Sequence, residues 1–345
     1  MDRRGRLSST KIPAMKLTAL LMLLLAAPAL LAQDAPATAK ALSRHDSSMD
    51  RAFEDVDREI DDALWYFKLG DAANIQKYRI ASSKPVRMKN ATGQGAGNPI
   101  IIPVYVFSPK NLKSRAPMLV FVHGGVHGRL DTGYANIFRE LLDQGYVIVS
   151  PEYRGSVGHG SELYDQIDYG GAEIDDVHDA RNWAVETLPN VDPNRVGIIG
   201  WSHGGFQTLF NIINWPDDYK VAYAGVPVSD LVQRMGYKSQ GYRDTFSGFI
   251  GKEAQDNPAE YRRRSPVNHV DKIRTPLMIH TNTNDEDVNV MEVEHLIEAL
   301  KAAGKKFEYK IYDNAPGGHV FNRIDTKLAR DSRQEIWAFL ARYLK

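Results

Sequence analysis

One serine in this sequence has neighbours that suit a covalent nucleophile. Ser202 lies in Gly200-Trp201-Ser202-His203-Gly204, which fits the pattern G-x-S-x-G. A short apolar run, residues 196–199, precedes the pattern, and a segment with a helical pattern follows it from Phe206. In a nucleophile elbow the serine occupies a strained strand-to-helix turn, and small neighbours let the two elements approach closely. The local pattern therefore predicts that Ser202 is a nucleophile at such a turn.

The serine needs two partners, because its hydroxyl attacks a carbonyl only when a base takes the proton and an acid orients the base. In an elbow fold the acid and then the histidine follow the serine along the chain. His319, in a Gly-Gly-His loop, is the candidate base. Asp285 is the preferred acid and Asp287 the alternative, both in the loop just after the expected strand 276–280. All of these residues follow predicted strands, so we expect them to meet at one edge of a sheet.

An acyl-transfer site also needs donors for the oxyanion. The backbone N–H of the residue after the nucleophile, His203, is one candidate, and the loop after the third strand supplies the other. That loop contains Gly124 and Gly125, whose lack of side chains lets the backbone approach a substrate. His123 and His127 flank these glycines without an acidic third ligand close by, which disfavours a metal pair. We expect neither a metal nor a cofactor.

The rest of the sequence alternates between short apolar runs and segments with a helical period. Alternation of this kind predicts an α/β fold, with a mostly parallel sheet and helices on both faces. The expected strands are residues 78–81, 100–107, 118–122, 146–150, 196–199, 222–226, 276–280 and 307–312. The expected helices between and after them are residues 135–144, 174–187, 206–214, 290–303 and 324–344.

Two further segments lie outside this alternation. Residues 229–266 form the longest irregular stretch, and we interpret it as a possible small helical cap over the site. Near the N-terminus an apolar stripe recurs at steps of three and four, which predicts an amphipathic helix that starts near Asp46 or Ser47 and stops at Gly70. We expect this stripe to dock on the main domain. Its members are Met49, Phe53, Val56, Ile60, Ala63 and Phe67.

Composition narrows the class of protein. The 345 residues include 43 Lys+Arg and 43 Asp+Glu, and this balance gives no support for a nucleic-acid partner. The length suits one large α/β domain or two small ones, and no internal repeat is visible. The chain has no cysteine, so a disulfide, a thiolate metal site and a cysteine nucleophile are all excluded.

The N-terminus predicts export. A basic start precedes an apolar run over residues 17–32 that ends in small residues, as in a secretory signal peptide. We therefore expect residues 1–32 to be a signal peptide, 33–75 an extension with the amphipathic helix, and 76–345 the catalytic domain. A periplasmic or secreted protein without stable membrane association follows from this, whereas an uncleaved anchor is the alternative. The sequence leaves the oligomeric state open.

With these residues in place, the chain resembles the catalytic domain of the prolyl oligopeptidase family of serine peptidases, a branch of the α/β-hydrolase fold. The resemblance implies Ser202 as nucleophile and His319 as base. It also implies Asp285 as the acid, since the family places that acid in an Asp-x-x-Val sequence. The motifs that carry the resemblance are Val122 to Gly125, Tyr153 to Gly160, Gly200 to Gly205, Ser265-Pro266 and Gly318 to Phe321.

Three departures from the family pattern bear on the site. The stretch from His280 to Asp285 is one residue longer than usual, which keeps Asp287 open as the acid. Val126 stands where a proline usually follows His-Gly-Gly. Many members carry an N-terminal β-propeller that filters substrates, whereas only about forty mature residues precede the hydrolase domain here, so we do not expect that selectivity.

The leading hypothesis is a serine peptidase that cleaves short peptides through a Ser-Asp-His triad and an acyl-enzyme. A carboxylesterase with the same residues is the alternative, because amide and ester cleavage share one mechanism. A non-catalytic binding protein on a hydrolase scaffold is disfavoured, since nucleophile, acid, base and oxyanion glycines are all present. The expected substrate is a small peptide or ester.

Overall fold

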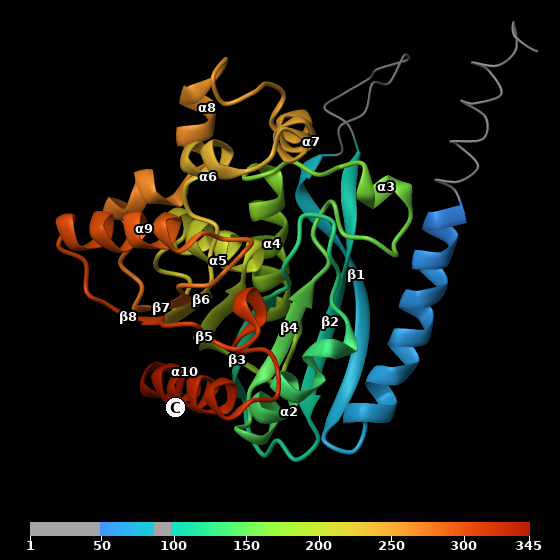
Figure 1. Ribbon diagram of the computed structural model, residues 1–345. Coiled ribbons are helices and arrows are strands. Elements are labelled where there is room, and N and C mark those ends of the chain that lie inside the picture. Colours follow the sequence, from blue (N-terminus) through green and yellow to red (C-terminus); the bar gives the residue numbers. More distant parts are fainter. Residues whose placement is uncertain (1–48, 86–97) are drawn as a thin grey trace, which may run out of the picture. The chain divides into compact units, whose positions relative to one another are not determined.

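The computed structural model describes residues 49–85 and 98–345 (Figure 1). The chain divides into two compact units, Met1–Phe53 and Glu54–Lys345, and the second contains every expected site residue. The predicted signal peptide and the predicted start of the N-terminal helix lie outside the described residues. Within the described residues, no helix is both long enough and apolar enough to cross a membrane.

One eight-stranded sheet forms the centre of the second unit, in the order β1-β2-β4-β3-β5-β6-β7-β8. The β1–β2 and β2–β4 pairs are antiparallel and all others are parallel. All eight predicted strands are confirmed, as is the mostly parallel sheet. Their bounds are β1 Ala73–Pro85, β2 Pro99–Pro109, β3 Ala116–Val122, β4 Val147–Pro151, β5 Val191–Trp201, β6 Val221–Gly225, β7 Leu277–Asn282 and β8 Phe307–Tyr312.

Helices cover both faces of this sheet (Figure 1). Strand β3 is buried throughout, and its alternate side chains belong to two different cores: Met118 and Val120 face one, Leu119 and Phe121 the other. This two-sided burial explains why the central strands are apolar at nearly every position. Helices α4 Ala172–Thr187, α5 His203–Asn214 and α9 Val290–Ala302 pack in the first core, and α2 Ala135–Asp143 and α10 Lys327–Leu344 in the second.

The irregular stretch 229–266 is helical, as the sequence suggested. It forms α6 Leu231–Tyr237, α7 Gln240–Ile250 and α8 Pro258–Arg263, which lie together in Figure 1. No residue of α7 is fully buried, but Tyr242, Phe246 and Phe249 pack partly against the first core. The remaining short helices are α3 Ser161–Tyr164, η1 Thr132–Tyr134, η2 Pro266–Lys272 and η3 Gly318–Val320.

The N-terminal helix covers residues 49–69 and ends at Gly70 as predicted, but the prediction that its apolar stripe docks on the main domain is wrong. Within the second unit, Val56, Ile60 and Phe67 are 54%, 56% and 87% exposed, and Ala63 is exposed as well.

The helix packs instead through two other apolar residues and through charged ones. Trp65 and Leu69 are each 1% exposed, and the indole of Trp65 contacts the rings of Phe107 and Phe138. Beside them, the hydroxyl of Tyr105 donates a hydrogen bond to Asp62 at 2.6 Å. The buried Trp65 and Leu69, together with the hydrogen bond from Tyr105 to Asp62, thus place the other face of the helix against the sheet.

Candidate active site

Ser202 lies at the junction between strand β5 and helix α5. Its φ and ψ are 60° and −121°, and a conformation with this positive φ is strained for any residue other than glycine. Its backbone N–H donates to the carbonyl oxygen of Gly225 at 2.9 Å, which ties the turn to the neighbouring strand β6. A strained serine held in place by backbone bonds at the carboxyl end of a central strand has the geometry of a nucleophile elbow.

The glycines around Ser202 are required by close backbone approach. A Cβ atom on Gly200 would collide with the carbonyl of Gly204, and one on Gly204 would collide with the carbonyl of Val122 in β3. The space that a side chain would fill is taken by backbone, so helix α5 starts as close as possible to strands β5 and β3. The G-x-S-x-G spacing thus has a steric cause in this chain.

His319 and Asp285 are brought together by the loops after β8 and β7. The imidazole Nδ1 of His319 lies 2.8 and 2.9 Å from the two carboxylate oxygens of Asp285. The Asp285 side chain is fully buried, and its Oδ1 also accepts the backbone N–H groups of Asp287 and Val288. A carboxylate fixed by its own loop can hold the imidazole in one orientation, with Nε2 as the nitrogen available for proton transfer.

Asp287, the alternative acid, lies on the other side of the same ring. Its Oδ2 is 3.6 Å from His319 Nε2, whereas its Oδ1 accepts from Lys238 at 2.6 Å and from the buried Arg234 at 3.0 Å. Burial raises the pKa of Asp287, but Arg234, Lys238 and His319 outweigh it and lower that pKa to about 2. Asp287 is therefore an anion paired mainly with two cations, not the carboxylate that holds Nδ1.

Asparagine side chains connect the two loops that carry Asp285 and His319. Asn282 donates to the carbonyl of Gly318 at 2.9 Å, and Asn284 donates to the carbonyl of Ala315 at 3.1 Å. These bonds fix the extra residue before Asp285 without displacing the carboxylate from the imidazole. The longer loop, which kept Asp287 open at the sequence level, therefore still presents Asp285 to Nδ1.

A third connection joins the serine turn to the histidine loop. The indole N–H of Trp201, next to Ser202, donates to Asn322 at 2.9 Å, and Asn322 donates to the hydroxyl of Tyr223 at 2.7 Å. The serine turn and the histidine loop are thus bonded neighbours at one edge of the sheet. No hydrogen bond joins the Ser202 hydroxyl to His319 in the described part of the chain; such bonds are often long or misaligned without substrate.

The candidate oxyanion donors flank Ser202. A Cβ atom on Gly124 would lie 3.5 Å from the Ser202 Cβ, so this part of the loop after β3 lies directly against the serine. Gly125 has a φ of 76°, which favours glycine there. His203 is the first residue of α5, where backbone N–H groups have no partner within the helix. Gly124 and the first residue of α5 therefore lie next to Ser202.

Two buried histidine–glutamate pairs lie behind these donors, and the sequence interpretation missed both glutamates. His203 Nε2 is 3.1 Å from Glu173, and His123 Nε2 is 3.2 Å from Glu152. Burial raises the pKa of Glu152, but His123 and His159 outweigh it and hold that pKa well below its ordinary value. The signal in the sequence was an acid placed directly after the apolar strand β4, at the edge where the site forms.

Aromatic side chains cluster beside His203. The ring of Tyr169 stacks on His203 with centroids 5.0 Å apart and contacts Phe246 of α7 at 5.1 Å. Phe249, also of α7, contacts His127 at 5.2 Å. Helix α7 thus brings apolar rings next to the residue that follows the nucleophile, which makes this side of the site suited to an apolar group.

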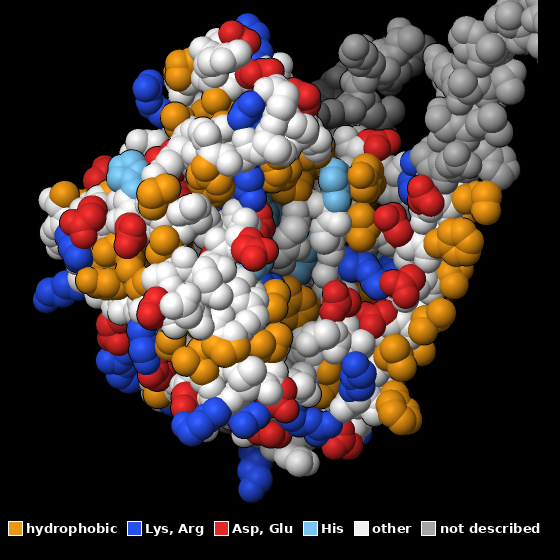
Figure 2. Space-filling model, in the orientation of Figure 1, with side chains coloured by type: hydrophobic (Ala, Val, Ile, Leu, Met, Phe, Trp, Pro, Cys, Tyr) orange, Lys and Arg blue, Asp and Glu red, His pale blue; other side chains and the backbone are white. Residues whose placement is uncertain are grey.

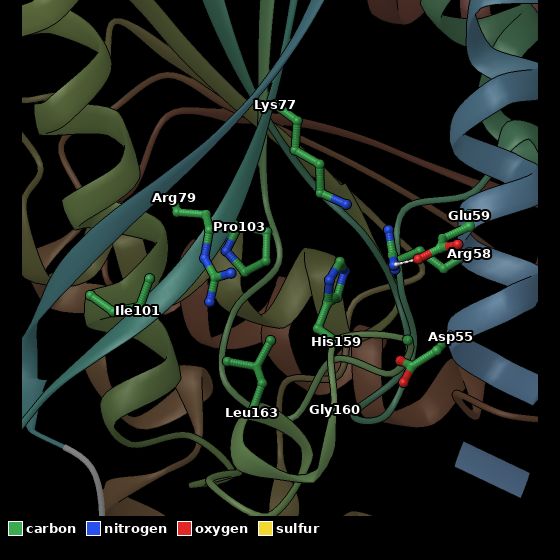
Figure 3. Close-up of a pocket in the computed structure, with 11 residues that line it drawn as sticks. Asp55, Arg58, Glu59, Lys77, Arg79, Ile101, Pro103, His159, Gly160 and Leu163 are labelled. Carbon is green, nitrogen blue, oxygen red and sulfur yellow. Dashed lines mark hydrogen bonds and ion pairs between the residues drawn. The ribbon is translucent and has the colours of Figure 1, made fainter. Parts of the chain in front are cut away.

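A separate cavity of about 530 Å³ lies on the β1–β2 side of the unit (Figure 3). It is bordered by Arg58 and Glu59 of the N-terminal helix, Lys77 and Arg79 of β1, and His159. None of the expected site residues lines it, so it is distinct from the candidate active site. Among residues 49–85 and 98–345 no group of three or more His, Asp or Glu side chains is arranged to hold a metal ion.

Comparison with known proteins agrees with this geometry. Residues 135–345, more than half of the chain, match the model of the prolyl oligopeptidase family. An uncharacterized peptidase, YuxL, of Bacillus subtilis is 29% identical over 251 residues, which is 70% of this chain and 37% of that protein. The acylamino-acid-releasing enzyme of Arabidopsis thaliana is 26% identical over 255 residues, 71% of this chain and 33% of that enzyme.

Solved structures with the same fold include the acylaminoacyl peptidase of Pyrococcus horikoshii, with a TM-score of 0.68 and 20% identity over 79% of this chain and 42% of that one. A puromycin-hydrolyzing peptidase of Mycobacterium tuberculosis gives a TM-score of 0.66 and 24% identity over 79% of this chain and 39% of that one. The chain therefore has the α/β-hydrolase fold of these peptidases and spans less than half the length of each relative.

Proposed function

Because the chain belongs to the prolyl oligopeptidase family, a family of serine peptidases, we propose that it cleaves short peptides through an acyl-enzyme on Ser202. The observation that carries this proposal is the double contact of Asp285 with Nδ1 of His319, at the sheet edge where Ser202 is strained. A carboxylate on Nδ1 stabilises the imidazolium that forms when Nε2 accepts a proton.

The steps follow from these positions. His319 Nε2 takes the proton of Ser202 Oγ as this oxygen attacks the scissile carbonyl carbon. The oxyanion is stabilised by the backbone N–H groups of His203 and of Gly124 or Gly125. The imidazolium then gives its proton to the leaving amine, the C–N bond breaks, and the acyl group remains on Ser202. Water, deprotonated by the same nitrogen, releases the acid and restores the serine.

Asp287 adds a requirement to the first step. With Oδ2 at 3.6 Å, this carboxylate is the anion that faces His319 Nε2 before substrate arrives. For proton transfer the imidazole must direct that nitrogen to Ser202. The Asp285 carboxylate must keep its contact with Nδ1 while the ring moves. The glycines at 317 and 318, both with positive φ, give the histidine loop room for such an adjustment.

The proposed contact for the side chain before the scissile bond is formed by the partly exposed rings of Phe246 and Phe249, which lie beside the buried Tyr169. These rings are partly or fully buried and are contributed by α7 and by the loop before α4. An apolar or aromatic side chain would bury its surface there, at roughly 25 cal/mol per Å². We therefore propose a preference for substrates with an apolar residue at this position.

The test compares substrate classes on one enzyme preparation. Purified protein and its Ser202→Ala variant are offered aminoacyl and acyl-aminoacyl p-nitroanilides with apolar or charged side chains, beside p-nitrophenyl acetate. Amide turnover that is lost in Ser202→Ala, with a higher kcat/KM for apolar side chains, is the expected result. Ester turnover without amide turnover would replace the peptidase with a carboxylesterase. No turnover of either class would favour a binding protein.

We propose further that the protein is exported. Support comes from the basic start and from the apolar run at residues 17–32. This run ends in small residues, as the apolar part of a signal peptide does. In a bacterial host, cell fractionation of the tagged full chain should place a shortened form, beginning near Gln33, outside the cytoplasm. Full-length protein retained in the cytoplasm would contradict the export proposal and leave the catalytic one untouched.

A further inference from the structure

An apolar stripe that the other described residues leave exposed runs along the N-terminal helix. The apolar stripe is defined here as Val56, Ile60, Ala63 and Phe67, all in the second unit and all exposed, Phe67 by 87%. Figure 2 shows the corresponding row of hydrophobic side chains along the right-hand edge of the molecule, where Figure 1 places the helix. A Phe side chain exposed to this extent, in a row of apolar neighbours, marks a surface that another molecule covers.

The opposite face of the helix is fixed. Asp61 accepts the backbone N–H and the hydroxyl of Thr132, and Asp62 accepts the hydroxyl of Tyr105. Figure 3 shows charged side chains of the same helix beside the cavity on the β1–β2 side. Trp65 is buried at the sheet. The helix cannot rotate to bury its own stripe without breaking these bonds and exposing the indole.

The spacing of the stripe identifies the kind of surface that fits it. Its members recur at steps of four, three and four residues, which is the a/d pattern of a coiled coil with a period of 3.5. Leu64, which is 39% exposed, borders this seam on one side. A second helix with the same seam is the matching surface.

We propose that the apolar stripe pairs with the same stripe of a second copy of this chain, as two antiparallel helices. In the antiparallel register Phe67 lies against the partner subunit's Val56, and Ile60 lies against the partner subunit's Ala63. Each pair joins a larger and a smaller side chain, so the helix separation stays even along the seam. A two-fold axis between Ile60 and Ala63 relates the copies, which makes the interface closed and self-complementary.

The acidic side chains of the helix favour antiparallel pairing over parallel pairing and over binding to an anionic lipid surface. Glu54, Asp55, Asp57 and Glu59 make the N-terminal half of the helix acidic. Parallel pairing would place these carboxylates beside their copies, whereas antiparallel pairing separates them along the seam. The same acidity disfavours an anionic lipid surface, to which amphipathic helices bind through Lys and Arg.

The size of the seam sets the expected strength. Twelve residues from Val56 to Phe67 span roughly 18 Å of helix at about 1.5 Å per residue. An interface of this length buries less than the ~800 Å² per partner of a standard interface. We therefore expect a reversible dimer that populates with rising protein concentration, not an obligate one.

The experiment measures mass in solution. Sedimentation velocity of the purified chain, over two orders of magnitude in concentration up to a few hundred micromolar, should show a shift from monomer to dimer. The variant Ile60→Glu with Phe67→Glu should remain monomeric throughout, because dimerisation would bury four carboxylates in an apolar seam. The matched control Met291→Glu, an exposed apolar residue on helix α9, should dimerise as the parent does. Unchanged circular dichroism and melting would show that the variants fold.

Cysteine crosslinking tests the register, because the chain has no cysteine of its own. An equimolar mixture of Val56→Cys and Phe67→Cys chains should form a disulfide-linked dimer much faster than either variant alone. Fast crosslinking of each variant with itself would indicate parallel helices and overturn the proposed pairing.

Two further results would overturn the proposal. A chain that remains monomeric at the highest concentration has no such interface. A chain that floats with phosphatidylcholine–phosphatidylglycerol vesicles, and loses flotation in Ile60→Glu with Phe67→Glu, uses the stripe to bind lipid instead. Both readouts are independent of catalysis, so neither depends on the peptidase assignment.

Discussion

Asp285 and Asp287 face the same imidazole from opposite nitrogens, and their surroundings give them different tasks. Asp285 is buried, bonded by its own loop, and contacts Nδ1 with both oxygens. Asp287 is half-exposed, and one of its oxygens accepts hydrogen bonds from Lys238 and Arg234. In the proposed mechanism, Asp285 on Nδ1 supports proton transfer, whereas Asp287 near Nε2 does not.

Replacing each carboxylate by its amide separates these roles. We expect Asp285→Asn to lower kcat/KM by about 10³- to 10⁴-fold, because the amide no longer selects the tautomer in which Nε2 accepts a proton. Asp287→Asn should change kcat/KM by less than about tenfold, since Nδ1 keeps its partner. Kinetics on one p-nitroanilide give both values, and equal losses in the two variants would contradict the assignment.

The serine turn depends on contact between whole elements. Gly204 lies where a methyl group would collide with the carbonyl of Val122, so helix α5 and strand β3 touch there through backbone. Because parallel strands end at a common edge, the site is assembled by this packing together with the β7 and β8 loops.

Gly204→Ala should therefore destabilise the protein by about 1–3 kcal/mol, since overpacking displaces α5 from β3. The matched control is Gly236→Ala in α6, where a Cβ meets nothing within 4 Å. That control should be neutral or stabilising by up to about 1 kcal/mol, as Ala favours helix. Urea unfolding of both variants measures the difference, and equal free energies of unfolding would refute the close approach.

Helix α7 supplies apolar rings to the approach beside His203. We expect Phe246→Ala to raise KM about tenfold for a substrate with an aromatic side chain, because the lost ring removes buried apolar contact. The rate of labelling by a small fluorophosphonate should stay within a factor of a few. Thr245→Ala, an exposed position on the same helix, is the control. An unchanged KM in Phe246→Ala would place the substrate side chain elsewhere.

The sequence predicted the sheet well because two-sided burial makes each central strand almost wholly apolar. It also placed Ser202 and His319 on loops that the structure connects through Trp201 and Asn322. Choosing between Asp285 and Asp287 required the side-chain bonds of Asn282 and Asn284, which are tertiary contacts that spacing does not encode.

The N-terminal helix shows what hydrophobic periodicity in a sequence cannot predict. Steps of three and four correctly predicted which residues share a face, but they do not say which face the sheet covers. Trp65 and a few charged residues decided that question, because their partners lie on distant strands and loops. The buried Glu152 and Glu173 escaped prediction for a related reason, because their histidine partners lie far away in the sequence.

For the molecule as a whole, buried His280 links stability to pH. Burial, more than any other influence, lowers the pKa of His280 to about 4 from its ordinary 6.5. The unfolded chain therefore binds more protons between these values, and stability falls as pH drops from 6.5 towards 4. This gap corresponds to about 3 kcal/mol of stability.

His280→Asn should flatten that dependence. We expect the variant to be less stable at pH 7, since the bond between His280 and Ser332 is altered, but to lose less stability than the parent between pH 6.5 and 4. Melting temperatures at a series of pH values measure both slopes. Parallel slopes for parent and variant would show that His280 does not titrate in this range.

The central claim is that Ser202 is made nucleophilic by His319 at the edge of the sheet. Its most direct test is the rate of fluorophosphonate labelling, with the adduct located by mass spectrometry in the parent, Ser202→Ala and His319→Asn chains. We expect one adduct, on Ser202, with no labelling in Ser202→Ala and labelling slowed at least a hundredfold in His319→Asn. An adduct on another residue, or equal labelling rates in the parent and His319→Asn, would contradict it.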